Sequence, residues 1–508
     1  MHKRGMTVKL RVSILAAAAA LCTSPAWAAL TVSGGATKNV VCSAGVCTAT
    51  AKRAVLNSND LHNLIEAGDV TLQSGPKAQD IEILAVISWA NTHHLTLDSY
   101  RGIKVTKHID VGNFGNAGLT VTTNDGGSGG IFYIAPRAKV DIESMAASLV
   151  INGATYQVAL DIPTLIVDIA ANPTGHFALG VDYDAGPDGT YQGDAITEFF
   201  TGTFEGLGHR ISRLSVDGRS GGAGQHNGMF YGVGGGPISN LHLINADIRA
   251  GQNAGAGGLA GLCFTEVFNV EVTGRVSGET GSQVGGLCGV ADNGSITSSH
   301  TSGAVAGTGN SGDERDVGGL VGLNDATIQN SSSSAKVTGA KGWTAGGLVG
   351  SNAGAIQTSF ATGAIVAGNN GVAGGLVGSS AGQDASVQNS YATGAAFGGT
   401  GSTVGGLIGL NNGPVSDSYA SGAVASGSGN AVGGLVGDDL GGSDLTDTYW
   451  DITTSGQSHG VGNNGYPGVM GLTTEQFQTG LPVGFDPSIW AENPAINNGL
   501  PYLTANPQ

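Results

Sequence analysis

The chain has 508 residues, of which 89 are glycine and 12% are charged, against about 25% charged in an average globular protein. Its 38 acidic and 21 basic side chains give a formal charge of −17, which excludes nucleic acids and anionic lipids as expected partners, because both bind basic patches. Disorder is also disfavoured, since disordered chains have few apolar residues and 40% of this chain is hydrophobic.

Residues 1–28 are typical of a secretory signal peptide. A basic head is followed by an apolar stretch from Val12 to Leu21 and by the small-residue cleavage signal Ala26-Trp27-Ala28. The apolar stretch is too short to cross a membrane, and no later one approaches 18 residues, so no transmembrane segment is expected. We therefore expect an exported protein, either extracellular or on the cell surface, with the periplasm as the alternative.

Residues 29–195 predict a β-rich region. Short apolar strands such as Ile81–Leu84, Leu95–Leu97 and Val140–Ile142 alternate with polar turns, and helical periodicity is nearly absent. One helical segment is expected at Ala54–Ala67, with Asn59-Asp60 as its cap. Because this alternation runs into unmistakable repeats, one continuous β-helix is the simplest architecture, with its regular core starting near residue 195.

Four cysteines follow the cleavage site, an even number that suits an oxidising compartment. Cys42 and Cys47 flank a glycine that allows a tight turn, which predicts a local disulfide. Cys263 and Cys288 are 25 residues apart, three short of one repeat, and a straight strand would offset them by roughly 10 Å. Two buried thiols are expected there, with their pairing left open.

Asp182, Asp184 and Asp188 are the candidate metal ligands. They alternate around a glycine turn, and calcium prefers such oxygen ligands, although the spacing and the bidentate glutamate of an EF-hand loop are missing. A solvated turn is the alternative. No other cofactor is expected, because the histidines show no zinc spacing.

Residues 196–448 contain the repeats. Gly-Gly-Leu-x-Gly occurs seven times, with intervals of 28, 33, 28, 28, 31 and 28 residues between successive leucines, and the excesses fall in Gly/Ser/Asn-rich loops. The leucines are Leu259, Leu287, Leu320, Leu348, Leu376, Leu407 and Leu435. A fixed period of this size indicates a solenoid, so the expected fold is all-β: a right-handed parallel β-helix with a C-terminal cap.

Each repeat carries a second element, of which Val387-Gln-Asn-Ser-Tyr-Ala-Thr-Gly394 is one example, and its Ser and Thr are expected to stack from coil to coil. The paired glycines predict a positive φ at a corner and room for the next coil. A phosphate-binding loop would need a following helix N-terminus, which no copy has.

Residues 449–508 break the repeat and predict the cap. Tyr449-Trp450-Asp451 is followed by Phe477, Phe485, Trp490 and Tyr502, which suit a segment that covers the open end of the solenoid. Thr473 and Gln476 predict a capping box at a short helical turn over Thr473–Thr479.

The Gly-Gly-Leu-x-Gly elements followed by Ser-Tyr-Ala-Thr-Gly resemble the GLUG motif of bacterial exported adhesin-like proteins. The stretch Ala85–Thr123 is similar to the repetitive region of filamentous-haemagglutinin-type exoproteins, and the tail is similar to the segment that closes GLUG arrays. The resemblance implies a β-helical secreted or surface protein associated with adhesion, with no shared catalytic residues. An outer-membrane secretion partner would be one route of export.

Two main functions follow as hypotheses. The first is a non-enzymatic adhesin-like protein that binds a cell surface, glycan or matrix component, because charges are scarce in the array and do not recur in register. The second is a polysaccharide lyase or glycoside hydrolase, which would need clustered carboxylates on one face. Ser/Thr columns at 302, 362, 393 and 421 leave binding to an ordered lattice such as ice as a third.

Overall fold

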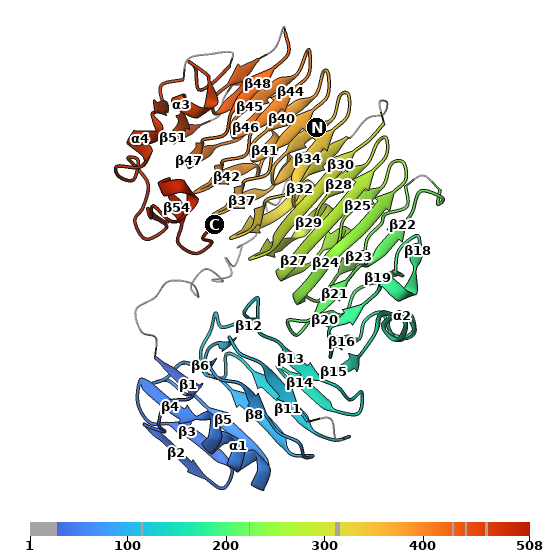
Figure 1. Ribbon diagram of the computed structural model, residues 1–508, viewed down its shortest axis with the longest axis vertical. Helices are drawn as coiled ribbons and strands as arrows, with labels where there is room; N and C mark the ends of the chain where they lie inside the picture. Colours follow the sequence, from blue (N-terminus) through green and yellow to red (C-terminus); the bar gives the residue numbers. More distant parts are fainter. Residues whose placement is uncertain are drawn as a thin grey trace, which may run out of the picture.

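The computed structural model describes residues 28–508 except 113–114, 223, 310–314, 429–430, 442–443 and 463–465. The signal peptide expected at residues 1–28 therefore lies, apart from Ala28, outside the described residues. The fold is all-β, as predicted, and is a β-solenoid of about 14 turns. Figure 1 shows two solenoid segments rather than one uninterrupted rod. Each segment has a hydrophobic core of its own. In the described part of the chain, no helix is both long and apolar enough to span a bilayer.

The first solenoid consists of short parallel strands stacked in three sheets around the core of Leu30, Ile81, Leu95 and their neighbours. The first sheet has the order β4 (Arg53–Asn57), β1 (Ala29–Ser33), β6 (Asp80–Ile83), β9 (Ile103–Val105), β12 (Phe132–Ile134). The second has β7 (Ile87–Ser88), β10 (Ile109–Val111), β13 (Val140–Ile142). The third has β3 (Val46–Ala49), β5 (Val70–Gln73), β8 (His94–Asp98), β11 (Gly118–Thr122), β14 (Ser148–Ile151).

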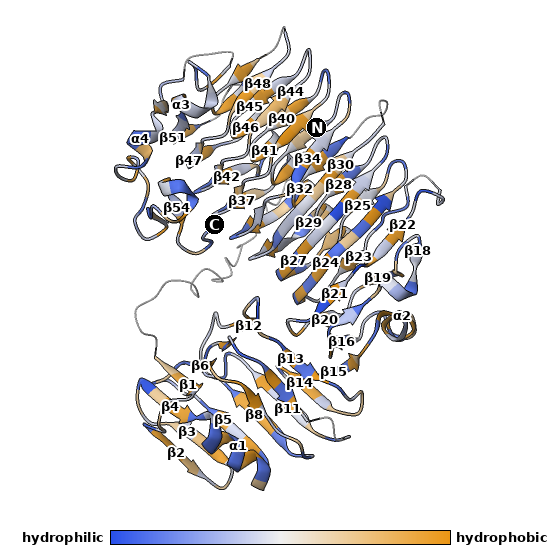
Figure 2. Ribbon diagram, viewed as in Figure 1, coloured by the Kyte–Doolittle hydropathy of each residue, from blue (hydrophilic) through white to orange (hydrophobic). Residues whose placement is uncertain are grey.

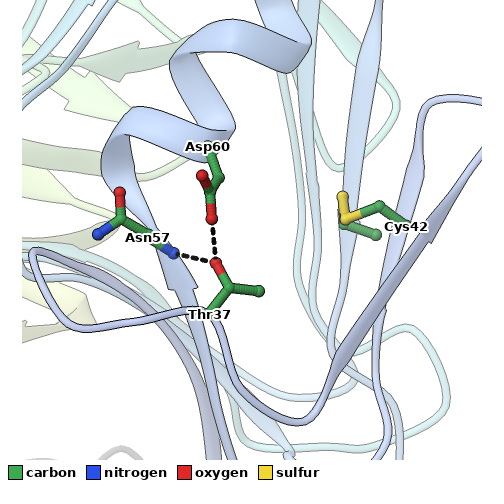
Figure 3. The surroundings of a disulfide bond; sticks show 5 residues. Thr37, Cys42, Asn57 and Asp60 are labelled. Carbon is green, nitrogen blue, oxygen red and sulfur yellow. Dashed lines mark hydrogen bonds between the residues drawn. A yellow bond between two sulfur atoms is a disulfide. The ribbon is translucent and has the colours of Figure 1, made fainter.

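The predicted helix is present but starts later than expected. Helix α1 spans Ser58–Ala67, and its N-cap is Asn57, whose side chain accepts a hydrogen bond from Asn59 N. Thr37 Oγ1 donates to Asp60 in the first turn and accepts from Asn57 N, as Figure 3 shows. The neighbouring hairpin of β2 (Val40–Ser43) and β3 holds the predicted Cys42–Cys47 disulfide.

The two cores overlap along the chain before and after the expected boundary at residues 195/196. The second core begins with Ala159 and includes α2 (Ile162–Ala171), but Ala178 of β16 (His176–Leu179) and Leu207 still belong to the first, so β16 contributes to both cores. The chain enters the second solenoid through an antiparallel hairpin of β14 and β15 (Ala154–Ala159). This hairpin ends the parallel stacking of the first solenoid and allows the chain to change direction.

Buried polar groups join the two solenoids. Asn240 accepts a hydrogen bond from Ile134 N (3.2 Å) and donates to Glu205 Oε1 (2.9 Å), and Asn269 donates to Ile134 O (2.8 Å). Glu205 is 5% exposed and also accepts from Leu207 N and Ser239 Oγ. Burial raises the pKa of the Glu205 carboxyl from 4.5 to about 7.

Raising the pH is expected to weaken this junction. Above pH 4.5 the unfolded chain ionises Glu205 while the folded protein keeps it protonated, so stability falls up to about pH 7, by roughly 3 kcal/mol. A Glu205→Gln variant keeps a neutral side chain of the same shape and should lose this part of the pH dependence in urea unfolding. The exposed Glu198→Gln variant is the control, and identical pH profiles for wild type and Glu205→Gln would contradict the prediction.

The second solenoid is built from the repeats, whose strands pair in register from coil to coil. After the entry coils β17 (Tyr183–Asp184), β18 (Thr190–Gln192), β21 (Arg210–Ser212) and β22 (Ser215–Asp217), one face continues β19 (Ile196–Phe200), β23 (Phe230–Gly234), β26 (Ala260–Phe264), β29 (Cys288–Thr297), β32 (Val321–Gln329), β36 (Val349–Asn352), β41 (Val377–Ser380), β46 (Ile408–Asn411), β50 (Val436–Asp439).

Three further faces complete each coil. One contains β25 (Gly255–Ala256), β28 (Gln283–Gly285), β31 (Asp316–Gly318), β35 (Thr344–Gly346), β40 (Val372–Gly374), β45 (Thr403–Gly405), β49 (Val432–Gly433). Another contains β20 (Thr203–Glu205), β24 (Ile238–Ala250), β27 (Glu266–Gly278), β37 (Ala355–Gln357), β42 (Ser386–Gln388), β47 (Val415–Ala420), β51 (Leu445–Asp451). The last contains β30 (His300–Gly307), β33 (Ser332–Ser333), β34 (Lys336–Gly339), β38 (Phe360–Ala361), β39 (Ile365–Ala367), β43 (Tyr391–Ala392), β44 (Ala396–Gly398), β48 (Val424–Ser426). Figure 2 shows hydrophobic residues recurring along these stacked rungs.

The Gly-Gly-Leu element forms one corner of each coil, with its leucine fully buried as predicted. The expected positive φ is wrong for the paired glycines, none of which adopts it. These positions need glycine because the backbones of adjacent coils approach each other closely. A Cβ at Gly347, for example, would lie 2.0 Å from Gly375 O in the next coil. Glycine is therefore needed because two backbones pass too closely for a side chain.

Positive φ occurs at a different corner, where a short polar residue takes the left-handed conformation in every coil. The residues are Asn240, Asn269, Ser298, Asn330, Thr358, Asn389, Asp417 and Asp447. The next residue is a buried serine or threonine in most coils, and Ser331 N, for example, donates to Ser359 Oγ one coil further on (3.2 Å). The predicted stacking of these hydroxyl side chains is thus present, as a ladder that satisfies buried backbone groups.

Cys263 and Cys288 form a second disulfide, so the prediction of two free thiols is wrong. Cys288 pairs in register with Ala260, three residues before Cys263, yet the two cysteine Cα atoms are 6.1 Å apart. Adjacent rungs already account for about 4.8 Å of that distance, so the chain bends sharply between Ala260 and Cys263. The prediction assumed a straight strand, whereas the cysteines lie on the inside of a corner.

Removing this disulfide is expected to destabilise the protein more than removing the one at Cys42. The cysteines of the Cys263–Cys288 bond are 25 positions apart in the sequence, against 5 for Cys42–Cys47. The longer loop corresponds to about 3.5 kcal/mol of chain entropy in the unfolded state, and the shorter one to about 2 kcal/mol. Paired alanine variants of each disulfide, compared in urea unfolding under oxidising conditions, measure the difference. Equal losses of stability would contradict the prediction.

The C-terminal segment has two parts. The first, from β51 through α3 (Ile452–Ser455) to β52 (Val469–Leu472), adds a final coil, and Trp450 and Val461 join the main core at the open end. The second runs from α4 (Thr474–Phe477), which has the predicted capping box of Thr473 and Gln476, through β53 (Trp490–Ala491) and β54 (Tyr502–Leu503). It folds back along the side of the coils, and Asn506 Nδ2 donates to Ser331 O.

Candidate functional site

One outward-facing position repeats through the second solenoid and changes character along its length. The register places one residue per coil in this position, which we call the outer column: Arg210, His242, Glu271, His300, Ser332, Phe360, Tyr391, Tyr419, Tyr449 and Met470. Its residues face outward because their neighbours, such as Leu241 and Leu243, are in the core. The column is polar at one end and aromatic at the other.

The aromatic end is covered by the C-terminal segment. Phe360, Tyr391, Tyr419 and Tyr449 form a hydrophobic cluster of their own with Phe477, Phe485, Trp490, Leu500 and Leu503. Successive rings stack, with centroids 4.9 Å apart for Phe360 and Tyr391 and 5.2 Å for Tyr391 and Tyr419. The predicted cap therefore covers the side of the last coils as well as their end.

The polar end lines a hollow of about 550 Å³, which we call the groove. Figure 1 shows β12 of the first solenoid and the C-terminus on the same side of the coils as β27 and β37. The groove is lined by Tyr133, Pro136, His242, Asn269, Val270, Glu271, Ser298, His300, Asn330, Ser332, Ser334, Phe360, Thr362 and residues 505–508. The first solenoid, the second solenoid and the C-terminal segment thus all contribute to the groove.

Two histidines and one carboxylate form the floor of the groove. His242 Nδ1 lies 2.9 Å from Glu271 Oε2, and His300 Nδ1 lies 2.8 Å from Ser332 Oγ. His242 is 3% exposed, and its other nitrogen, Nε2, is buried without a hydrogen-bond partner among the described residues. The hydrogen bond from His242 lowers the pKa of Glu271, and burial lowers the pKa of His300. Glu271 is therefore ionised and His300 uncharged at neutral pH.

Aromatic rings lie at two sides of this polar floor. Tyr133 comes from β12 and packs edge-on against Phe268, with ring centroids 6.2 Å apart, while Phe360 begins the aromatic end of the outer column. Asn506 holds the chain's last residues against Ser331 on a further side. A hollow that combines many hydrogen-bonding side chains with aromatic rings at its sides suits polar small molecules or short chain segments.

Each of the three predicted calcium ligands contacts a different set of protein groups. Asp182 accepts from His209 Nδ1 (3.1 Å), Lys139 Nζ (3.2 Å) and Arg210 N (3.0 Å), and the hydrogen bond from His209 is the main reason why its pKa is well below the ordinary range. Asp184 pairs with Arg213. The carboxylate of Asp188 accepts from two tyrosine hydroxyls.

Each of these carboxylates thus already has donors from the protein. Among the residues that the structure describes, no group of three His, Cys, Asp or Glu side chains is arranged to hold a metal ion. The calcium site at Asp182, Asp184 and Asp188 gains no support from this arrangement and stays a prediction.

A second hollow, of about 470 Å³, lies in the first solenoid beside Tyr100. Asp98 and Asp125 both line it, and burial and then Asp125 raise the pKa of Asp98.

The outer column was not predicted, although its signal is in the sequence. The repeated element places His300, Phe360, Tyr391 and Tyr419 at one position, four residues after an inward Ile or Val. The polar half could not be located that way alone, because the groove also needs Tyr133 and residues 505–508, which are distant in the sequence.

Comparison with known proteins identifies the repeat. The family model of the GLUG motif matches residues 314–338. A segment of 104 residues, 20% of the chain, is 36% identical to halomucin of Haloquadratum walsbyi, and 181 residues, 34% of the chain, are 29% identical to the immunoglobulin A1 protease of Streptococcus pneumoniae. The chain spans 1% and 9% of the lengths of these two relatives.

Two solved structures are similar at low sequence identity. An IgA1 protease is 20% identical with a TM-score of 0.35, over 57% of this chain and 21% of the other. A candidate immunoglobulin A1 protease from Bacteroides ovatus is 17% identical with a TM-score of 0.37, over 69% of this chain and 92% of the other. The predicted resemblance is confirmed for the repeat itself: the chain carries the GLUG motif.

Proposed function

We propose that the protein is exported and works as an adhesin-like binding protein that attaches to a cell surface, glycan or matrix component. The groove is the observation that carries this proposal, because it offers hydrogen-bonding side chains between aromatic rings on a rigid stack of coils. Two disulfides support export, since such bonds persist in oxidising compartments.

The groove favours binding over hydrolysis. Glu271 is the one carboxylate side chain among the described residues that line it, whereas glycoside hydrolases use a pair. The protease activity named for three of the similar proteins belongs to much longer chains or to structures of low similarity, so it contributes nothing to the proposal.

Retention on surfaces tests the proposal. The purified chain starting at Ala29 is applied at micromolar concentration to a glycan array, to matrix proteins and to intact cells. Saturable retention on at least one of them is expected, and no retention on any would contradict the proposed function. Reducing or unsaturated sugar ends released from a polysaccharide panel would favour the hydrolase or lyase alternative instead.

A further inference from the structure

The strongest unexplained feature of the groove is the unpartnered Nε2 of His242. Glu271 accepts from Nδ1, so in the neutral imidazole the proton is on Nδ1 and Nε2 carries a lone pair. A buried acceptor without a partner is costly, and native proteins rarely leave one. His242 lines the groove, so a ligand bound there would lie against this side chain.

The groove also has a repeating geometry. His242, Glu271, His300 and Ser332 lie on four successive coils, and parallel strands are about 4.8 Å apart. This rise is close to the length of one hexose unit in an extended polysaccharide. A sugar chain that runs parallel to the solenoid axis would therefore present one unit to each coil, with its hydroxyl groups opposite the column.

We propose, on the basis of the proposed function, that the groove binds a neutral polysaccharide laid along the solenoid axis, with a sugar hydroxyl donating to His242 Nε2. Glu271 is a positioning residue that keeps the proton of His242 on Nδ1. Tyr133, which is half-buried, offers an apolar ring against which the C–H face of a sugar packs, and the buried Phe360 lies at the far end of the groove.

Charge selects a neutral chain over an acidic one. Within the described lining, Glu271 is the one Asp, Glu, Lys or Arg side chain, and the protein as a whole has a formal charge of −17. A carboxylated or sulfated chain would bring more negative charge next to Glu271, and no Lys or Arg is among the described lining residues, although Arg210 and Lys104 lie beside His242 and Tyr133. A hydroxyl group carries no such penalty.

Oligosaccharide length provides the first test. Neutral oligomers of glucose, mannose or xylose with one to eight units are titrated into the mature protein by calorimetry, alongside uronic acid oligomers of the same lengths. For at least one neutral series, affinity is expected to rise up to about four units, one for each polar coil, and then to level off. Preference for the acidic series, or affinity independent of length, would overturn the proposal.

Variants provide the second test. His242→Ala and Tyr133→Ala should each weaken binding about 10-fold or more, because each removes a partner that is buried in the complex. Glu266→Gln, an exposed change on the same strand as Glu271, is the matched control and should bind like the wild type. Circular dichroism and thermal unfolding verify that each variant is folded.

The outcomes separate the two proposals. If the wild type binds a surface or glycan and His242→Ala binds it equally well, the groove is not the site, although the proposed function stands. If the wild type binds no glycan, matrix protein or cell, the proposed function itself fails, and the groove proposal with it.

Discussion

Replacing Gly346 by alanine is expected to destabilise the second solenoid by roughly 3 kcal/mol or more, which is large for a single methyl group. A Cβ at this position would lie 1.8 Å from Val349 O and 2.6 Å from Gly378 N of the next coil. Both atoms belong to the backbone, so no side chain can move aside to make room. The corner must open, and opening it breaks the pairing of β35 with β40 on the adjacent coil.

Amide hydrogen exchange measures where this loss occurs. Faster exchange is expected first in the coils on either side of Gly346, since each coil of a solenoid contacts only its neighbours, with a lower midpoint in thermal unfolding. Gly222→Ala is the matched control, because a Cβ at Gly222 would meet no atom within 4 Å. Similar exchange and unfolding in the two variants would show that the close approach at Gly346 is not required.

The period of the repeat was enough to predict the solenoid because every coil obeys the same local constraint. Leu259 and its equivalents are buried wherever Gly-Gly-Leu-x-Gly occurs, and the serine ladder follows the same spacing. Helix α2 was missed although Asp161 caps it and Pro163 lies in its first turn. Its apolar residues are continuous with strand-like segments on either side, and so the helical period was obscured.

The parts of the site that were not predicted depend on contacts between distant segments. The turn from the first solenoid into the second, the bend that brings Cys263 to Cys288 and the return of residues 505–508 to Ser331 all arise from tertiary packing. None has a local signal in the sequence. The outer column could have been predicted from the repeats. The groove could not, because its walls include Tyr133 and residues 505–508, which lie outside the repeats.

The return of the C-terminal segment depends most on Tyr419. Its ring is fully buried between Tyr391 and the side chains of Phe477 and Trp490, at centroid distances of 5.2 Å from Tyr391 and Phe477. Its hydroxyl donates to Pro501 O and accepts from Asn497 Nδ2, both at 2.7 Å. One side chain thus joins the coils to both ends of the segment that folds back over them.

Tyr419→Ala is expected to cost about 4 kcal/mol and to release residues 474–508 from the side of the solenoid, because a buried aromatic ring and two hydrogen bonds are lost. Tyr419→Phe keeps the ring and should cost about 1.5 kcal/mol, while Phe397→Ala, at a ring that is 40% exposed on another face, should cost less than roughly 1 kcal/mol. Limited proteolysis should cleave the segment in Tyr419→Ala before the coils unfold. Since Asn506 is part of the same segment and lines the groove, Tyr419→Ala should also lose ligand affinity there. If the segment stays protected from protease in this variant, the assignment of Tyr419 as its anchor is wrong.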